Sequence, residues 1–398
     1  MSSWVSHGAE MALRSVALPF VLGCRWLAEQ GDQGGAPPDG TGSGWMRRLK
    51  TAADELFFAS EFLVGESSAF FDVGRLRAET QEAVAFFRAR GWLDDPVTYH
   101  ETPPPLREVA VDDLAARGGP YQHLRFESGY SPAEGEPGRE RWLASAPNLT
   151  AHAWLLRHPG PPRPWIVCAA AYRMGDPSVD FLGFRARWLH HSLGVNVAIP
   201  VVPFHGPRRV GRRGGDGFMT GDFVDTVHAV AQTVWDVRRL IDWLRHEGAP
   251  AIGVYGLSLG GCTSALVASL EATLDCVVVG IPAVDFAGLM RWNLRGPLVQ
   301  ATERLGFPWE DVATLLRVVS PLAVAPRVAK PRRFLFGAAG DTLAPPGQTR
   351  ALWRHWDEPR LLLYDGGHVS FLFEAAVRDL LVEALATTGF LPSRSDAA

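Results

Sequence analysis

The sequence predicts an α/β fold, in which a mostly parallel sheet carries helices on both faces. From about Tyr121 onward, short apolar runs alternate with longer helical patterns, which is the order of parallel strands connected by helices. Some runs, such as Trp165 to Ala170, are apolar throughout, as expected of strands buried on both faces. The composition, 47% hydrophobic and 21% charged over 398 residues, supplies enough apolar surface for a large core.

The expected elements form one domain over residues 121–390. The segments 121–130 and 142–146 alternate between apolar and polar residues, which is typical of antiparallel edge strands. Further strands are predicted at 149–157, 165–170, 195–202, 251–255, 276–281, 334–336 and 361–364, and helices at 180–193, 222–246, 259–271, 346–356 and 369–388. The segment 282–329 interrupts this alternation. We predict that it forms a short helical lid rich in large apolar side chains, although packing onto the sheet explains the same residues.

Residues 1–120 are predicted to form a helical N-terminal extension that covers one side of the domain. The glycine- and proline-rich stretch 31–44 is a flexible loop or linker, and 49–63 and 75–90 show helical periodicity. No chemistry is evident in this extension. At the other end of the chain, residues 391–398 are predicted to be a disordered tail.

Residues 11–28 are apolar, but Arg14, Pro19 and Arg25 interrupt them too often for a membrane-spanning helix. Three interpretations fit this stretch. It is a helix docked on the domain, a peripheral helix that faces a membrane, or a secretory or lipoprotein signal that ends at Cys24. The first is favoured, so we expect a cytoplasmic protein, with membrane association through this helix as the alternative.

The charge and the cysteines exclude some classes of partner. A net charge of −4 gives no reason to expect binding to nucleic acid. Cys24, Cys168, Cys262 and Cys276 lack the spacing of a metal site, and the second and fourth lie in apolar strand-like runs. The cysteines therefore give no reason to expect a metal, and the serine chemistry inferred below needs neither a metal nor an organic cofactor. The oligomeric state does not follow from the sequence.

The most informative stretch is Gly256-Leu257-Ser258-Leu259-Gly260, which lies between an apolar strand and a small-residue helix start. Gly-x-Ser-x-Gly in that position is the pattern of a nucleophile elbow. The turn is so tight that the serine adopts an unfavourable backbone angle and the flanking positions have no room for a side chain. We predict that Ser258 is a nucleophile exposed at the carboxyl end of its strand.

A serine hydroxyl needs a base to take its proton, and the base needs a carboxylate to orient it. Asp341 follows the strand 334–336 on a glycine-flanked loop, and His368 follows the strand 361–364 after two glycines. Both are expected at the same sheet edge as Ser258. We predict Ser258, Asp341 and His368 as a catalytic triad, with Asp285 as the second choice for the acid.

These motifs make the chain resemble the α/β-hydrolase superfamily over about residues 121–390. Gly-x-Ser-x-Gly, Gly-x-x-Asp and Gly-Gly-His are the specific parts of the match. More narrowly, the loops 171–176 and 203–209 and the helical extension resemble a poorly characterised α/β-hydrolase-domain group of bacteria and mitochondria.

The chemistry also requires donors for the oxyanion that forms when a carbonyl is attacked. One is expected from the backbone N–H of Leu259, and the other from the loop after strand 165–170, where Tyr172 is our candidate. His-Gly stands in that loop in many superfamily members, whereas this chain has Ala-Ala-Tyr.

Three further residues are candidates for contact with the substrate. His205 lies on the loop after the next strand, as either a structural or a substrate-contacting residue. Arg208 is expected near the mouth of the substrate pocket and could contact an anionic group of the substrate, although a solvated arginine is an equal alternative. Trp292 belongs to the predicted lid.

Together these features predict a serine hydrolase that cleaves a carboxylic ester, a thioester or a lipid-like ester through an acyl-enzyme. An acyltransferase with the same triad is the nearest alternative. A non-catalytic binding protein that kept the fold is the alternative from another class.

Overall fold

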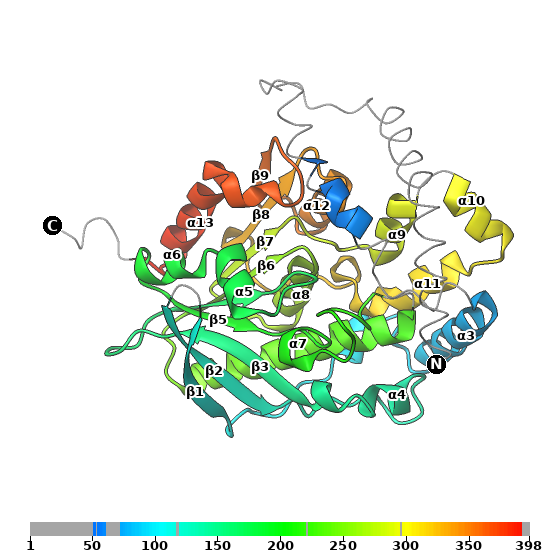
Figure 1. Cartoon of the computed structure of the whole chain (residues 1–398), viewed down its shortest axis with the longest axis horizontal. Coiled ribbons are helices and arrows are strands. Elements are labelled where there is room, and N and C mark those ends of the chain that lie inside the picture. The colour runs from blue at the N-terminus through cyan, green and yellow to red at the C-terminus, as the bar shows by residue number, and fades with distance from the viewer. Residues whose placement is uncertain are drawn as a thin grey trace.

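A computed structural model of the chain describes residues 51–52, 54–60, 72–116, 119–219, 222–294 and 297–391 (Figure 1). The predictions made for residues 11–28, for the loop 31–44 and for the tail from residue 392 lie outside these ranges. In the described part of the chain, no helix has the length and apolarity needed to cross a membrane.

Within the described residues, nine strands form one sheet in the order β1-β2-β3-β5-β4-β6-β7-β8-β9. The first four strands in that order, β1, β2, β3 and β5, pair antiparallel, and every pair from β5 to β9 is parallel. The strands are β1 (Ala110–Ala116), β2 (Gly119–Glu127), β3 (Thr150–Leu156), β4 (Trp165–Ala169), β5 (Asn196–Pro200), β6 (Ile252–Leu257), β7 (Cys276–Gly280), β8 (Arg333–Ala338) and β9 (Arg360–Tyr364).

Helices cover both faces of this sheet (Figure 1). Helices α7, α8 and α12 pack on one face, and α6 and α13 pack on the other. The helices are α3 (Val73–Ala89), α4 (Arg139–Leu143), α5 (Pro177–Gly183), α6 (Ala186–His191), α7 (Phe223–His246), α8 (Leu259–Leu270), α9 (Phe286–Leu294), α10 (Pro297–Arg304), α11 (Trp309–Leu316), α12 (Pro346–His355) and α13 (Ala375–Thr387).

Burial follows the position of each strand in the sheet. Every residue of β4, β5, β6, β7 and β8 is buried, whereas most of β1 is exposed. A central strand covered on both faces must be apolar on both sides, which is why these runs carry no alternation. The predicted α/β fold with a mostly parallel sheet is therefore confirmed.

Three local predictions differ from the structure. The segment 142–146, predicted as a strand, forms the end of α4 and a 3-10 turn, because Gly138 at φ 78° starts a helix and Trp142 anchors it in the core. The helix predicted at 180–193 is two helices, α5 and α6, separated by Arg185 at φ 50°. The region predicted to be a helical extension contains β1, which pairs with β2 as the edge of the sheet.

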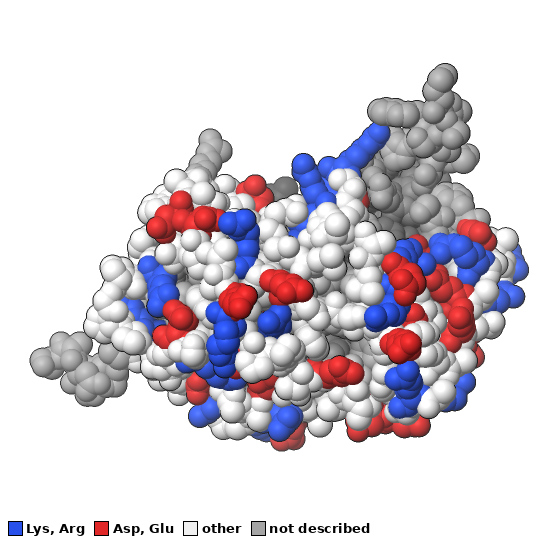
Figure 2. All heavy atoms as spheres, turned by 90° about the horizontal axis from the view of Figure 1, so that it is seen from below, with Lys and Arg blue, Asp and Glu red and all other residues white. Residues whose placement is uncertain are grey.

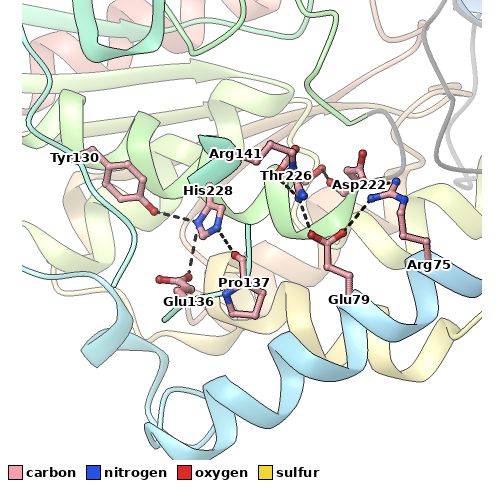
Figure 3. A network of polar contacts seen from close by, with 10 residues as sticks. Arg75, Glu79, Tyr130, Glu136, Pro137, Arg141, Asp222, Thr226 and His228 are labelled. Atoms are coloured by element: carbon pink, nitrogen blue, oxygen red, sulfur yellow. Dashed lines mark hydrogen bonds and ion pairs between the residues drawn. The ribbon is translucent and has the colours of Figure 1, made fainter. Parts of the chain in front are cut away.

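Helix α3 of the extension is held on the domain by charged side chains (Figure 3). Arg75 pairs with Asp222 at 2.8 Å, ahead of the first turn of α7. Glu79 pairs with Arg141 of α4 at 2.7 Å, and Arg141 also pairs with Asp225 of α7 at 2.8 Å. The network joins three helices that are far apart in the sequence. On the face shown in Figure 2, basic and acidic side chains are interspersed rather than separated into patches.

Beside this network lies a buried carboxyl group. Glu136 is 4% exposed, accepts hydrogen bonds from Tyr99 at 3.1 Å and from the backbone N–H of Ala133 at 2.8 Å, and lies 3.7 Å from His228 Nδ1 (Figure 3). Burial raises the pKa of Glu136 from 4.5 to about 7 and lowers that of His228 to about 4, so the imidazole offers no positive charge at neutral pH.

The Glu136→Gln variant should therefore gain stability over the wild type as the pH rises. The folded pKa lies above the unfolded one, so the contribution of Glu136 is fully present below pH 4.5 and is lost as the pH rises to about 7. Urea unfolding at pH 5 and pH 8 should show the difference between the two proteins shifting in favour of the variant by about 1–3 kcal/mol. A difference that does not change with pH would contradict this assignment.

Candidate active site

Ser258 lies directly after β6, as the N-cap residue of α8, in a strained conformation. Its backbone angles are φ 55° and ψ −112°, outside the regions that residues with a side chain favour. Its backbone N–H donates to Gly280 O at 3.0 Å, and its carbonyl accepts from Ala283 N at 3.2 Å. Both bonds tie the turn to the end of β7. Such a strained conformation persists only where the surroundings hold it, and it is typical of functional turns.

The two glycines of the motif are required by contacts with neighbouring backbone. A Cβ on Gly260 would lie 1.8 Å from Ala169 O at the end of β4, and one on Gly256 would lie 2.0 Å from Gly260 O. Neither atom can move without shifting the main chain. The sequence-based explanation of these glycines therefore agrees with the geometry. The contact also places the loop after β4 directly beside the start of α8.

Asp341 and His368 meet at the same sheet edge. Asp341 follows β8 and His368 follows β9, and Oδ2 of the carboxylate lies 2.7 Å from Nδ1 of the imidazole. The other oxygen of Asp341 accepts the backbone N–H groups of Leu343 at 3.0 Å and Ala344 at 2.7 Å. The carboxylate is thus fixed by its own loop and presents one oxygen to the ring. With Nδ1 engaged, Nε2 is the nitrogen that remains to act as a base.

The surroundings of His368 favour its charged form. Burial lowers the pKa of the imidazole, but the charge of Asp341, the hydrogen bond to it and the charge of Asp54 together raise the pKa above the ordinary 6.5. A base with a raised pKa accepts a proton more readily, which is what a serine hydroxyl requires.

Ser258 belongs to the same edge, but no hydrogen bond joins its hydroxyl to His368 within the part of the chain that the structure describes. The three residues follow β6, β8 and β9, and β7 is the one strand between β6 and β8. The structure thus brings Asp341 and His368 into contact and places Ser258 at the carboxyl end of the strand two positions from β8.

Asp285, the second choice for the acid, has a different role. Its Oδ1 accepts the backbone N–H of Gly288 at 2.9 Å, in the first turn of α9. Its backbone N–H donates to Gln348 at 2.8 Å. Asp285 therefore caps a helix, and no contact joins it to His368 among the described residues.

Of the two positions predicted for the oxyanion hole, Leu259 lies in the elbow and Tyr172 lies on the loop after β4, whose first residues contact Gly260. Leu259 is the first residue of α8, where backbone N–H groups have no partner within the helix. The loop after β4 turns tightly, because Ala171 N contacts Met174 Sδ at 3.2 Å and Arg173 N donates to His205 Nε2 at 3.1 Å. The ring of Tyr172 lies under the guanidinium of Arg173, at 4.7 Å from the ring centre.

His205 is a structural residue. It is 1% exposed, and its Nδ1 lies 2.8 Å from Pro203 O. With its Nε2 accepting the N–H of Arg173, the ring connects the loop after β5 to the loop after β4. Burial lowers its pKa to about 4, so the ring is neutral. Of the two roles considered for His205, the structural one fits these contacts.

The prediction that Arg208 contacts an anionic substrate is wrong. Its side chain is fully buried, and its guanidinium pairs with Asp236 of α7 at 2.8 Å and donates to the carbonyls of Val201 and Asn148 at 2.9 Å. The alternative, a solvated arginine, is wrong too, although it describes the exposed neighbour Arg209. A buried guanidinium needs an acid and several acceptors, and sequence alone did not reveal Asp236 as that acid.

Trp292 lies on α9, and its indole N–H donates to Thr342 O at 3.0 Å, on the loop of Asp341. It is half-buried, so its contact with a substrate stays a prediction. The predicted excursion at 282–329 does contain helices. However, Phe307, Trp309, Leu315 and Leu316 are buried in the core, so packing accounts for these four apolar residues.

One residue of the site was missed by sequence analysis. Asp54, in the described helical segment 54–60, is fully buried and accepts the backbone N–H of His368 at 2.7 Å. No motif marks it, because an isolated aspartate in a helical pattern is normally a surface residue.

Comparisons with known proteins agree with this architecture. A family model described as "Alpha/beta hydrolase domain containing 18" matches residues 183–287, which include the elbow. Two proteins of Mycobacterium tuberculosis, one from each of two strains and both described as uncharacterised, are each 40% identical over 326 residues, which is 80% of this chain and 76% of the relative. The chain belongs to the α/β-hydrolase superfamily.

Solved structures show the same fold. An acetyl xylan esterase from Paenibacillus sp. is 20% identical to this α/β hydrolase, with a TM-score of 0.50, over 80% of this chain and 95% of the esterase. Acetyl xylan esterase 1 from Thermoanaerobacterium sp. is 16% identical, with a TM-score of 0.51, over 76% and 93% of the two chains. At these identities the likeness establishes the fold and leaves the substrate open.

The elbow predicts an unequal response to two Gly→Ala substitutions. Gly260→Ala should lower the free energy of unfolding by about 3 kcal/mol, the upper end of the usual cost of overpacking, because the new Cβ must displace the Ala169 carbonyl. Gly347→Ala, in the first turn of α12, meets no atom within 4 Å and should leave stability unchanged or raise it by up to about 1 kcal/mol. Urea unfolding measures the stability of both variants. Equal stabilities would contradict the close approach of α8 to the end of β4.

The correction at Arg208 is tested by stability rather than by binding. Arg208→Gln should cost about 3–5 kcal/mol, because it leaves the Asp236 carboxylate buried without its cation. Arg209→Gln, next to it and exposed, should change stability by less than about 0.5 kcal/mol. If Arg208→Gln unfolded like the wild type and instead raised KM for an anionic ester, the residue would be a substrate contact after all.

Proposed function

We propose that this protein is a serine hydrolase that cleaves carboxylic esters through Ser258, His368 and Asp341. The observation that carries the proposal is the 2.7 Å contact between His368 Nδ1 and Asp341 Oδ2, at the sheet edge where a strained elbow holds Ser258. A histidine oriented by a carboxylate can activate the hydroxyl group of a serine that comes within its reach.

In the proposed first step, His368 Nε2 takes the proton of Ser258 Oγ while Oγ forms a bond to the carbonyl carbon. The carbonyl oxygen becomes an oxyanion, which the backbone N–H of Leu259 and one from the loop after β4 stabilise by about 3 kcal/mol per donor. The intermediate collapses as His368 gives its proton to the leaving alcohol oxygen. The acyl group is then bound to Ser258 as an ester.

In the second step, His368 takes a proton from water, and the water oxygen attacks the acyl carbon. The C–O bond to Ser258 breaks, the serine regains its proton from His368, and the carboxylic acid leaves. Asp341 stays ionised in both steps and stabilises the imidazolium that forms each time.

The proposal requires Ser258 and His368 to come within hydrogen-bond reach when a substrate is present. Catalytic hydrogen bonds are often long or misaligned without substrate and tighten in the complex. The Ser258 side chain turns about a single Cα–Cβ bond, so a change of rotamer alters the position of Oγ without any movement of the strained backbone.

Support for an ester as the bond type comes from two directions. An oxygen ester or a thioester has a better leaving group than an amide, so the same triad cleaves it with a lower barrier. The acetyl xylan esterases that share the fold are, by their names, ester hydrolases. Within this class we propose a carboxylic ester, with a thioester or lipid-like ester as narrower possibilities, and Trp292 as an apolar contact for the acyl group.

The proposal predicts a specific pattern with a fluorophosphonate probe and a short p-nitrophenyl ester. The wild type should be labelled and should hydrolyse the ester, whereas Ser258→Ala should not be labelled and should lose at least about 10³-fold in kcat. Asp341→Asn should be labelled at Ser258 far more slowly than the wild type and lose on the order of 10⁴-fold in kcat, because the ring then lacks its orienting charge. Asp285→Asn is the matched control and should hydrolyse the ester at close to the wild-type rate.

The pH profile gives a second readout from the same assay. Because the pKa of His368 is raised above 6.5, kcat/KM should fall as the pH drops through a midpoint above that value. Labelling of neither the wild type nor Ser258→Ala would favour a non-catalytic binding protein. Transfer of the acyl group to an added alcohol in preference to water would favour an acyltransferase.

A further inference from the structure

The helical segment at residues 54–60 presents a charged residue to the protein and an apolar one to solvent. Asp54 is fully buried, whereas Leu56 is 72% exposed. Among the described residues 51–52 and 54–60, Asp54 alone is fully buried. Burying an ionised carboxylate is costly unless it is paired or hydrogen-bonded, so the contacts of Asp54 account for its position. In Figure 1 this segment, in dark blue, lies near α12 and α9.

The carboxylate of Asp54 binds three backbone N–H groups of the two loops that hold Asp341 and His368. Oδ2 accepts His368 N at 2.7 Å and Thr342 N at 3.4 Å, and Oδ1 accepts Val369 N at 3.2 Å. Both oxygens accept, and among the described residues neither has a partner that needs a donated proton, which is the pattern of an ionised carboxylate. Hydrogen bonds from N–H groups to a charged oxygen are roughly twice as strong as neutral ones.

Asp54 and Asp341 therefore place two negative charges near one imidazole, in different ways. Asp341 holds the ring through Nδ1, and Asp54 holds the main chain of His368 through its N–H. Both charges favour the imidazolium, while burial opposes it. For Asp54 itself, burial is the main cause of a raised pKa, the His368 N–H lowers it, and the charge of Asp341 raises it again.

Building on the proposed function, we propose that Asp54 is a positioning residue of this active site, supplied by the N-terminal extension. It fixes the His368 loop relative to the Asp341 loop and adds negative charge beside the imidazole. The extension then completes the catalytic site, in addition to covering one side of the domain. Asp54 acts through His368 and touches no reacting atom.

The test compares Asp54→Asn with Leu56→Ala, a control on the same segment whose side chain is exposed. With p-nitrophenyl acetate, Asp54→Asn should lower kcat by about 10- to 100-fold, because loss of the carboxylate loosens the base, while KM changes by less than about twofold. The acidic limb of its pH profile, where kcat/KM falls as the pH drops, should move to lower pH. Removing a negative charge lowers the pKa of His368. Leu56→Ala should match the wild type in kcat and in the midpoint of the acidic limb.

Two results would overturn the proposal. One is an Asp54→Asn variant with the kcat and the acidic limb of the wild type. The other is a loss of kcat with the limb left at the wild-type pH, which is what a purely structural role would produce. If Asp54→Asn does not fold, Asp54→Glu replaces it. Because that variant keeps the charge, its limb should stay at the wild-type pH, and a downward shift would contradict the proposal.

An NMR titration of the His368 ring separates this inference from the proposed function. The ring signals are assigned by their loss in His368→Gln, and their midpoint should fall in Asp54→Asn relative to the wild type. This readout needs no substrate, so it remains valid if the wild type does not hydrolyse esters. An active wild type with an unchanged His368 midpoint in Asp54→Asn would reject the role of Asp54 and leave the proposed function intact.

Discussion

The hydrogen bond between His368 and Asp341 is the interaction on which the site depends. It joins the loops after two neighbouring strands, β8 and β9, at the carboxyl edge of the sheet. The sheet sets the spacing of the two loops, and the contacts of Asp341 with its own backbone set the direction of its carboxylate. In the proposed mechanism, a base that is already oriented would lose little entropy when a substrate arrives, so its position would contribute to catalysis.

The second constraint is the close packing around Ser258. The start of α8 approaches the end of β4 so closely that no side chain fits at Gly260. The same contact positions the N–H of Leu259 next to the loop after β4, where two oxyanion donors would have to converge. Strain at Ser258 is thus accommodated by the fold, as is common at functional sites.

Much of this arrangement could be predicted from the sequence because the strands are apolar throughout and glycines mark the turns. The strands β4 to β8, the elbow, and the positions of Asp341 and His368 all follow from such local patterns. Arg208 could not be placed, because its partner Asp236 lies on a helix 28 residues further along the chain. The prediction of a strand at 142–146, where α4 ends, was also wrong, because a short alternation of apolar residues fits both a strand and a turn of helix.

Asp54 illustrates a limit of a different kind. Its contacts are with backbone N–H groups more than 280 residues away, and backbone donors leave no trace in a sequence pattern. Once the structure is known, the burial of this aspartate and its hydrogen bonds to the two loops indicate its role. Through Asp54, the extension contacts the loops after β8 and β9, so we infer that it contributes to the site as well as covering one side of the domain.

The most direct test of the central claim is a crystal structure of the protein after reaction with a phosphonate ester inhibitor. We expect a covalent bond from phosphorus to Ser258 Oγ, a phosphonyl oxygen within hydrogen-bond distance of Leu259 N, and His368 Nε2 facing the adduct. An adduct on another residue, or an adduct at Ser258 with the imidazole turned away from it, would contradict the account.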